Sequence, residues 1–133
     1  MTYEAQIRDR LSNDVNMIVA DGTGIEKGTI MALTDGRVVA PSSAAQVFGG
    51  ILMREKIAND GRTSVPCNFY GIFDLYATSG AAITVGDCVS LSGANMIKEA
   101  TEAEIQAGLG IGKALETTSA GTAETIQVFV GNI

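Results

Sequence analysis

Short apolar stretches that alternate with polar or small residues follow one another along the chain after Met17. The alternation has a period of two at Thr29/Met31/Leu33, Val65/Cys67/Phe69, Val89/Leu91 and Ile126/Val128/Val130. This period is typical of short strands with one buried face. Tight-turn dipeptides separate the stretches, because Asn, Asp and Gly tolerate positive φ; they are Asp21-Gly22, Asp35-Gly36, Asp60-Gly61 and Ser79-Gly80. The regular spacing favours an all-β barrel or sandwich.

One short helix is predicted near residues 102–107. The stretch Thr-Glu-Ala-Glu that begins at Thr101 has the form of a capping box, with Thr101 as the N-cap and Glu104 at the third helical position. Gly108 is a natural residue to follow the helix end. Structural capping explains these acidic residues better than catalysis does.

Residues 1–16 are polar and mixed in charge, and we treat them as an N-terminal arm before a single domain over residues 17–133. Tyr3, Ile7 and Leu11 recur at intervals of four, a spacing that would place them on one face of a short helix. Two interpretations stay open, a frayed terminus and an arm that buries these side chains against a partner. The start of the chain has no basic segment followed by an apolar one, so we expect no secretory signal.

The domain contains two similar halves, at about residues 21–71 and 79–131. At an offset of 58 the identities are Gly22/Gly80, Ile25/Ile83, Gly28/Gly86 and Leu33/Leu91. Gly50-Ile51 matches Gly110-Ile111 at an offset of 60, and the last strands stay in phase at 61. Neither half alone could cover its apolar face, so two halves that close one compact barrel are the economical prediction.

Composition and charge narrow the function classes. Apolar residues make up 46% and charged residues 18% of the 133 positions, which excludes a disordered chain. The net charge of −6 opposes binding to phosphates, so we expect no nucleic-acid partner. No apolar run approaches the roughly 18 residues that span a bilayer, so we expect no membrane helix.

The residues for metal or redox chemistry are few. The chain has no His, and its two cysteines, Cys67 and Cys88, form no CxxC pair, so we expect no metal site. We interpret both as small buried side chains on strands. Free thiols favour a reducing compartment, which means synthesis in the cytoplasm. Asp74 and Asp87 lack a companion carboxylate at a recognisable spacing, and only the fold decides whether they meet.

Residues 107–114 superficially follow the P-loop pattern of nucleotide-binding proteins. That motif requires Gly at its first position and Ser or Thr after the Lys, but these places hold Ala107 and Ala114. The predicted helix also precedes the loop instead of following it. Gly110 and Gly112 are better explained by close backbone packing in a strand. We therefore expect no nucleotide and no other cofactor.

Aromatic residues are concentrated between Phe69 and Tyr76. On a strand, one face would carry Phe69 and Phe73, and the other Tyr70 and Tyr76. Core packing is the default role for such residues. Large apolar groups on both faces also indicate that one face meets another subunit, with Tyr70 and Tyr76 as the candidate interface residues.

Seven stretches together carry a resemblance to a known family. They are residues 20–29 (ADGTGIEKGT), 50–51 (GI), 54–64 (REKIANDGRTS), 71–74 (GIFD), 83–87 (ITVGD), 91–95 (LSGAN) and 112–116 (GKALE). The chain resembles, over residues 17–131, a family of small tailed-phage proteins often labelled as RecA/RadA-type recombinases. Its members are similar to head decoration (cement) proteins, including the lambda-like type. The incomplete P-loop and the acidic charge give the recombinase label no support.

The resemblance implies a compact β-barrel or β-tulip on the outer surface of the expanded capsid. It further implies homotrimers at local three-fold positions, an N-terminal arm that grips the major capsid protein, and no catalytic residues. The candidate arm contacts are Tyr3, Ile7, Arg8, Arg10 and Leu11. The leading hypothesis is a structural virion protein that bridges coat subunits and stabilises the head. The alternative is a capsid-displayed binding module for attachment to the host surface.

Overall fold

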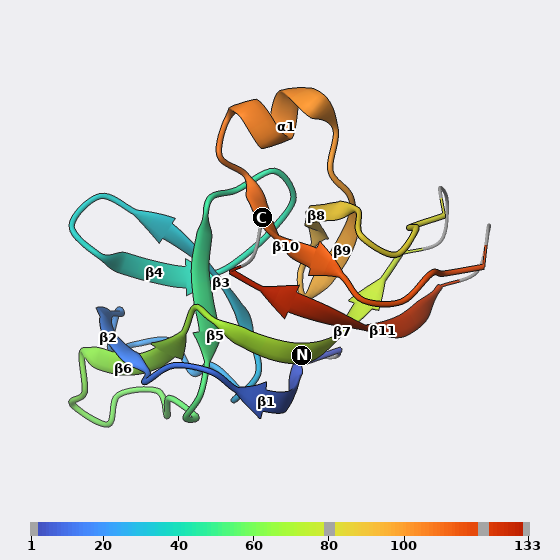
Figure 1. Ribbon diagram of the computed structural model, residues 1–133. Helices are drawn as coiled ribbons and strands as arrows, with labels where there is room; N and C mark the ends of the chain where they lie inside the picture. Colours follow the sequence, from blue (N-terminus) through green and yellow to red (C-terminus); the bar gives the residue numbers. More distant parts are fainter. Residues whose placement is uncertain (1–2, 79–81, 120–122, 132–133) are drawn as a thin grey trace.

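The computed structural model describes residues 3–78, 82–119 and 123–131. Over these residues the chain forms eleven strands and one short helix (Figure 1). The elements are β1 (Gln6–Arg10), β2 (Val15–Ile18), β3 (Ile30–Thr34), β4 (Val38–Pro41), β5 (Phe48–Leu52), β6 (Ser64–Asn68), β7 (Gly71–Ala77), β8 (Cys88–Gly93), β9 (Met96–Glu99), α1 (Glu102–Gln106), β10 (Gly110–Ala114) and β11 (Glu124–Val130).

The strands close into two five-stranded barrels. In the first barrel β2, β4, β3, β5 and β6 follow one another around the ring. In the second the order is β7, β11, β10, β8 and β9, and parallel pairing of Tyr76 with Met96 joins β9 back to β7. The prediction of an all-β chain built from two similar halves is confirmed, but the halves form two closed barrels and not the one barrel that they were expected to close together. Each half closes into its own barrel through one parallel pairing. In the first barrel β2 pairs with β4, and in the second barrel β7 pairs with β9.

The two barrels share the same register. Met17 pairs with Val65 in the first barrel, and Leu75 pairs with Ile126 in the second, at offsets of 58 and 61. The predicted match of Gly50-Ile51 with Gly110-Ile111 is wrong by two residues. In the first barrel Ile30 pairs with Ile51. In the second barrel the residue equivalent to Ile30 is Cys88, which pairs with Lys113. Ile51 therefore corresponds to Lys113, at an offset of 62. Both pairings contain a bulge, but Ile30 and Ile51 are fully buried whereas Cys88 and Lys113 are half-buried.

Apolar packing joins the barrels. The first barrel has its own core, which includes Met17, Met31 and Val65. Ile30 and Ile51 belong to the first barrel but pack with the core of the second. Figure 1 shows β3 and β5 between the remaining strands of the first barrel and those of the second. The shared core ties the two halves together.

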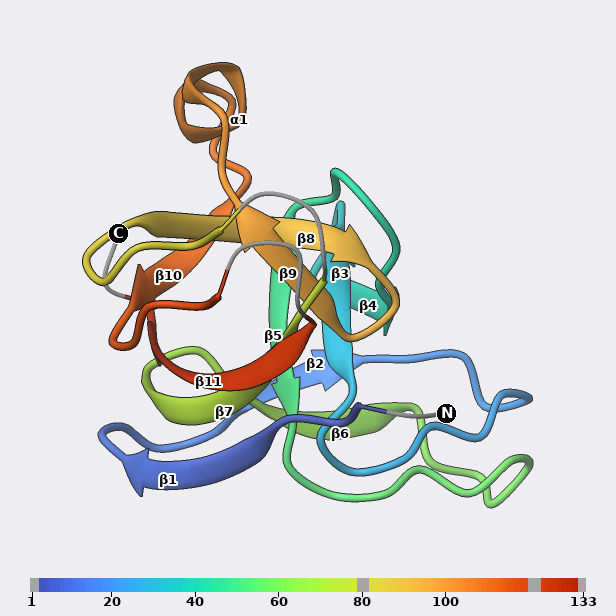
Figure 2. The same cartoon turned by 90° about the vertical axis from the view of Figure 1, so that its right-hand side faces the viewer.

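The helix α1 projects from the barrels, as Figure 2 shows. The predicted capping box is present, because the Thr101 hydroxyl accepts from the Glu104 backbone and the Glu104 carboxylate accepts from the Thr101 backbone. Gly108 follows the helix with a φ of +77°. The helix and its caps are therefore confirmed.

Both cysteines are free and lie on strands, as predicted. Cys67 is fully buried, and burial raises the pKa of its thiol to about 12. Cys88 is only half-buried, so the prediction of a buried side chain is wrong there. Its position at the start of β8 explains the exposure. Burial and the neighbouring Glu104 still raise the pKa of Cys88.

Candidate functional site

The N-terminal segment begins the candidate site. Residues 6–10 form β1, which pairs antiparallel with β7 and places Ile7 opposite Phe73. The predicted helical face is therefore wrong for this segment, because the backbone hydrogen-bonds to an available edge of β7. Ile7 packs against the core of the second barrel, whereas Tyr3 and Leu11 stay exposed.

Tyr3, a candidate contact of the N-terminal arm, and Tyr76, a candidate interface residue, lie next to each other in the structure. The rings of Tyr3 and Tyr76 are stacked, with centroids 3.8 Å apart and planes 6° from parallel. A hydrogen bond with Tyr3, together with burial, raises the pKa of Tyr76. The backbone N–H of Ala5 donates to the Gly28 carbonyl at 2.8 Å and fixes the same segment to the first barrel. Tyr76 thus has a covering partner within its own chain.

Tyr70 lies just before β7 and is more exposed than Tyr76. Its ring packs against Phe129 with centroids 5.3 Å apart. Phe73 is buried in the core, so the tyrosines and this phenylalanine point to opposite faces. Tyr70 therefore presents an aromatic surface that the described part of the chain leaves accessible.

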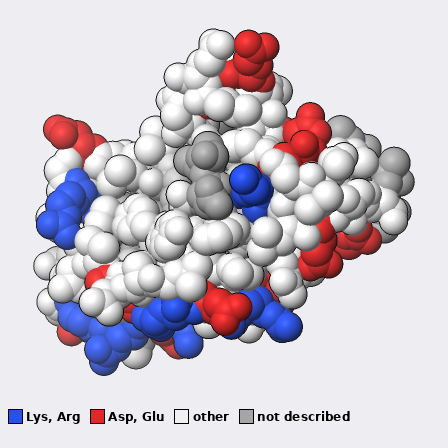
Figure 3. Space-filling model, viewed as in Figure 1, with Lys and Arg blue, Asp and Glu red and all other residues white. Residues whose placement is uncertain are grey.

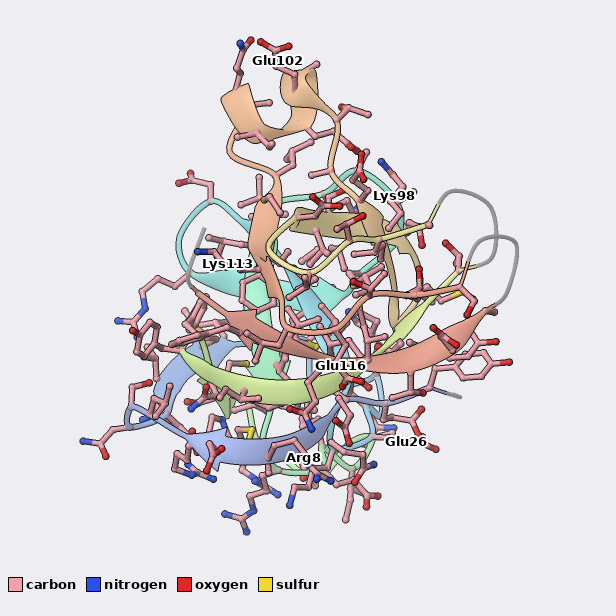
Figure 4. The ribbon with its side chains drawn as sticks, turned by 45° about the vertical axis from the view of Figure 1, so that its right-hand side comes forward. Arg8, Glu26, Lys98, Glu102, Lys113 and Glu116 are labelled. Carbon is pink, nitrogen blue, oxygen red and sulfur yellow. The ribbon has the colours of Figure 1, made fainter. Side chains whose placement is uncertain are left out.

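The two arginines of β1 point outward. Arg8 lies 3.5 Å from Asp74, and Arg10 lies 2.7 Å from Asp14, with about half of each arginine side chain exposed. Ion pairs of this kind contribute little to stability, because water screens them. Figure 4 shows Arg8 at one end of the molecule and Glu102 of α1 at the other. Both guanidinium groups can exchange their partners for an external carboxylate.

Charge is distributed unevenly between the halves. Residues 1–70 carry seven basic and eight acidic side chains, whereas residues 71–133 carry two basic and seven acidic ones. Figure 3 shows basic side chains gathered along the edge where β1, β2 and β6 lie in Figure 1. Acidic side chains lie over α1 and the second barrel in the same view. The protein therefore has a basic edge and an acidic end.

Sequence reasoning missed a buried cation. The Lys56 side chain is inaccessible, and its Nζ donates to Asp60 Oδ1 at 2.6 Å and to Asp21 Oδ1 at 2.9 Å. Hydrogen bonding from Lys56 is the main cause that holds the pKa of Asp60 far below its usual range. Although burial opposes the charged form of Lys56, the two carboxylates together raise its pKa. The one available signal was Asp60, four residues after Lys56 in a predicted turn.

The other acidic groups have partners elsewhere. Glu104 accepts from Lys98 at 2.5 Å and from the Thr101 backbone, and these contacts lower the pKa of Glu104 to about 2. Asp74 faces Arg8. Asp87 instead meets Glu99, and the hydrogen bond that the Asp87 carboxylate accepts from the Glu99 carboxyl, together with the negative charge of Asp87, raises the pKa of Glu99. The fold therefore gives Asp74 and Asp87 separate partners.

The remaining site chemistry is sparse in the part of the chain that the structure describes. No group of three or more His, Cys, Asp or Glu side chains is arranged to hold a metal ion there. The described residues enclose no pocket. Within the same ranges, no helix has the length and apolarity needed to cross a membrane.

These features define a small double-barrel protein whose candidate sites are surfaces. Its sequence matches the phage cement protein family over residues 12–130, and the chain belongs to this family. Comparison with curated proteins gives no match. Family membership indicates a capsid-associated structural role and makes the protein a virion capsid component. The predicted family resemblance is confirmed.

Proposed function

We propose that this protein decorates the outer surface of the expanded capsid and bridges neighbouring major coat subunits. It acts as a homotrimer at local three-fold positions, after synthesis in the host cytoplasm. The trimer makes additional contacts across each seam, so separating the coat subunits requires breaking those contacts too. Because it binds the expanded shell in preference to other forms, it stabilises that state by linkage.

The observation that carries the proposal is the exposed face of β1 within a chain of this family. Arg8, Arg10 and Leu11 lie together in sequence with largely accessible side chains. They follow Tyr3 and Ile7, which fix the segment to the second barrel. The fixed part positions the segment, and the exposed part supplies charge and apolar area for the coat. Tyr70 is the proposed contact between copies in the trimer, and Tyr76 supports the segment beside it.

The first experiment is the copy number of this protein relative to the major coat protein in purified particles. We expect a near-equimolar ratio, because decoration places the protein at sites repeated over the whole shell. A few copies per particle would move the protein to a vertex, tail or fibre and favour the host-attachment alternative. Complete absence from particles would overturn the proposal.

A further inference from the structure

The second barrel has its outer edge covered, and the first barrel does not. In the second barrel, β1 pairs with β7 beside the parallel β7–β9 junction, and Tyr3 stacks on Tyr76 at that junction. In the first barrel the corresponding junction joins Ile18 of β2 to Val38 of β4. Among the strands that the structure describes, only β4 and β6 pair with β2. No strand of the described chain therefore occupies the place equivalent to β1, and the Arg37 guanidinium lies there on the Asn16 carbonyl.

The apolar residues at this place are exposed. An offset of 58 relates Val15, Ile18 and Val38 to Phe73, Tyr76 and Met96. Their exposed fractions are 39%, 47% and 38%, whereas Phe73, which lies beside Ile7 in the core of the second barrel, is 1% exposed, and Tyr76 and Met96 are half-buried. Val15, Ile18 and Val38 thus occupy the positions that β1 and Tyr3 cover in the second barrel, and in the first barrel these side chains are exposed to water.

The polar groups at the two places have opposite charge. In the second barrel Asp74 of β7 faces Arg8 of β1 at 3.5 Å. Its counterpart in the first barrel is Asn16, whose carbonyl accepts from the exposed guanidinium of Arg37 at 2.5 Å. A strand that binds here meets a cation where β1 meets an anion. A second copy of β1 would bring Arg8 toward Arg37 and be repelled.

We infer that the edge of β2 beside Ile18, Val38 and Arg37 binds an extended acidic and apolar segment of a coat subunit. The segment adds a strand antiparallel to β2, as β1 does to β7, and covers the three exposed aliphatic side chains. Its carboxylate pairs with Arg37 in place of the Asn16 carbonyl, which is then free to accept from the added strand. This inference rests on the proposed function for the identity of the partner. It adds a second contact, on the first barrel, to the one made by the N-terminal segment.

The test uses expanded capsids that lack this protein, together with the full-length chain. We expect Ile18→Asp and Arg37→Glu to weaken binding to these capsids about tenfold or more, because each opposes the apolar or charge complementarity. The matched controls are Val85→Asp, at an exposed apolar position of the second half, and Lys113→Glu on β10. The controls should bind as the wild type does. Thermal unfolding of each variant verifies that it remains folded.

A photo-crosslinking residue in place of Ile18 provides a readout that does not depend on affinity. We expect a covalent product with the major coat protein, and none when the same residue replaces Val85. A product between two copies of this chain would overturn the assignment to the coat, and so would the absence of any product. If the wild type binds capsids and Ile18→Asp binds equally well, the inference fails while the proposed function stands. If the wild type does not bind, both fail.

Discussion

The ammonium group of Lys56 lies 2.6 Å from Asp60 Oδ1 although the lysine side chain is fully buried. The same nitrogen donates to Asp21 Oδ1 and to the backbone carbonyls of Asp21 and Ile57. One cation therefore joins the turn at Asp21 to the turn at Asp60. In the second barrel Thr118 takes the corresponding place, and its hydroxyl accepts from the Ile83 backbone. The two barrels thus secure equivalent loops with different chemistry.

Replacing Lys56 by Met should destabilise the protein strongly. The substitution keeps an unbranched side chain in the site but removes the buried cation between the carboxylates of Asp21 and Asp60, and leaves only the exposed Arg62 beside Asp60. We expect a clear fall in the midpoint of thermal unfolding, measured by circular dichroism. Lys27→Met is the control, because Lys27 is exposed, and it should leave the midpoint nearly unchanged. Equal midpoints for the two variants would contradict this role of Lys56.

Glu104 links stability to pH in the acid range. Hydrogen bonding from Lys98, and then from the Thr101 backbone, lowers the pKa of Glu104 from 4.5 to about 2. Because the pKa is lower in the folded state, the contribution is present above about pH 4.5 and is lost as the pH falls toward 2. The stability difference between wild type and Glu104→Gln should therefore be largest above pH 4.5 and vanish near pH 2.

Urea unfolding midpoints at a series of pH values measure this difference. Glu102→Gln removes a charge from the exposed side of the same helix and serves as the control. It should give a smaller difference from the wild type. A difference for Glu104→Gln that stays constant between pH 6 and pH 2 would show that the ion pair with Lys98 is not its source.

Gly112 has no room for a side chain. A Cβ at this position would lie 2.5 Å from the Phe129 carbonyl oxygen and 2.9 Å from the Val130 Cα, both on the neighbouring strand β11. Gly112→Ala should cost about 1–3 kcal/mol in the free energy of unfolding, because backbone atoms must move apart. Gly93→Ala meets nothing within 4 Å and should change stability by less than about 0.5 kcal/mol. Denaturant titration of both variants measures the contrast.

The alternation of residues predicted the core strands well because it depends on local geometry. Val65 and Cys67 of β6, like Ile126 and Val128 of β11, are buried as their period of two requires. The capping box at Thr101 was equally clear, since all its groups lie within one helical turn. Sequence also indicated the two halves, because each repeats its turns at nearly constant offsets.

The N-terminal segment was mispredicted for a simple geometric reason. An interval of four residues places Tyr3, Ile7 and Leu11 on one face of a helix, but four is also a multiple of the strand period of two. Whether this segment forms a helix or a strand depends on the free edge of β7, with which it pairs. That edge is 60 or more residues away in the sequence, so a local pattern of residues carries no information about it. The burial of Lys56 had the same cause, because it needs two distant turns to meet.

Tyr70 provides a test of the proposed trimer. Its ring is exposed beside Phe129, and aromatic side chains of this kind contribute strongly to protein interfaces. We expect Tyr70→Ser to weaken self-association about tenfold or more, as measured by sedimentation equilibrium. Ile105→Ser, at an exposed position of α1, should leave association unchanged. A wild-type chain that stays monomeric at all concentrations would show that the trimer, if it forms, requires the capsid.

The arginines of β1 test the proposed contact with the coat without disturbing the strand. Deleting the segment would remove Ile7 from the core, so substitutions of exposed side chains are more informative. Arg8→Glu combined with Arg10→Glu should abolish most binding to expanded capsids, because it reverses the charge that the coat carboxylates meet. Wild-type binding should also weaken as salt rises from about 0.05 to 0.5 M, since screening shortens the range of these attractions. The double variant should keep only the part of this salt dependence that comes from Arg37, whereas Lys113→Glu on the second barrel should retain it in full. Retention of the full salt dependence in the double variant would place the electrostatic contact with the coat on another part of the basic edge.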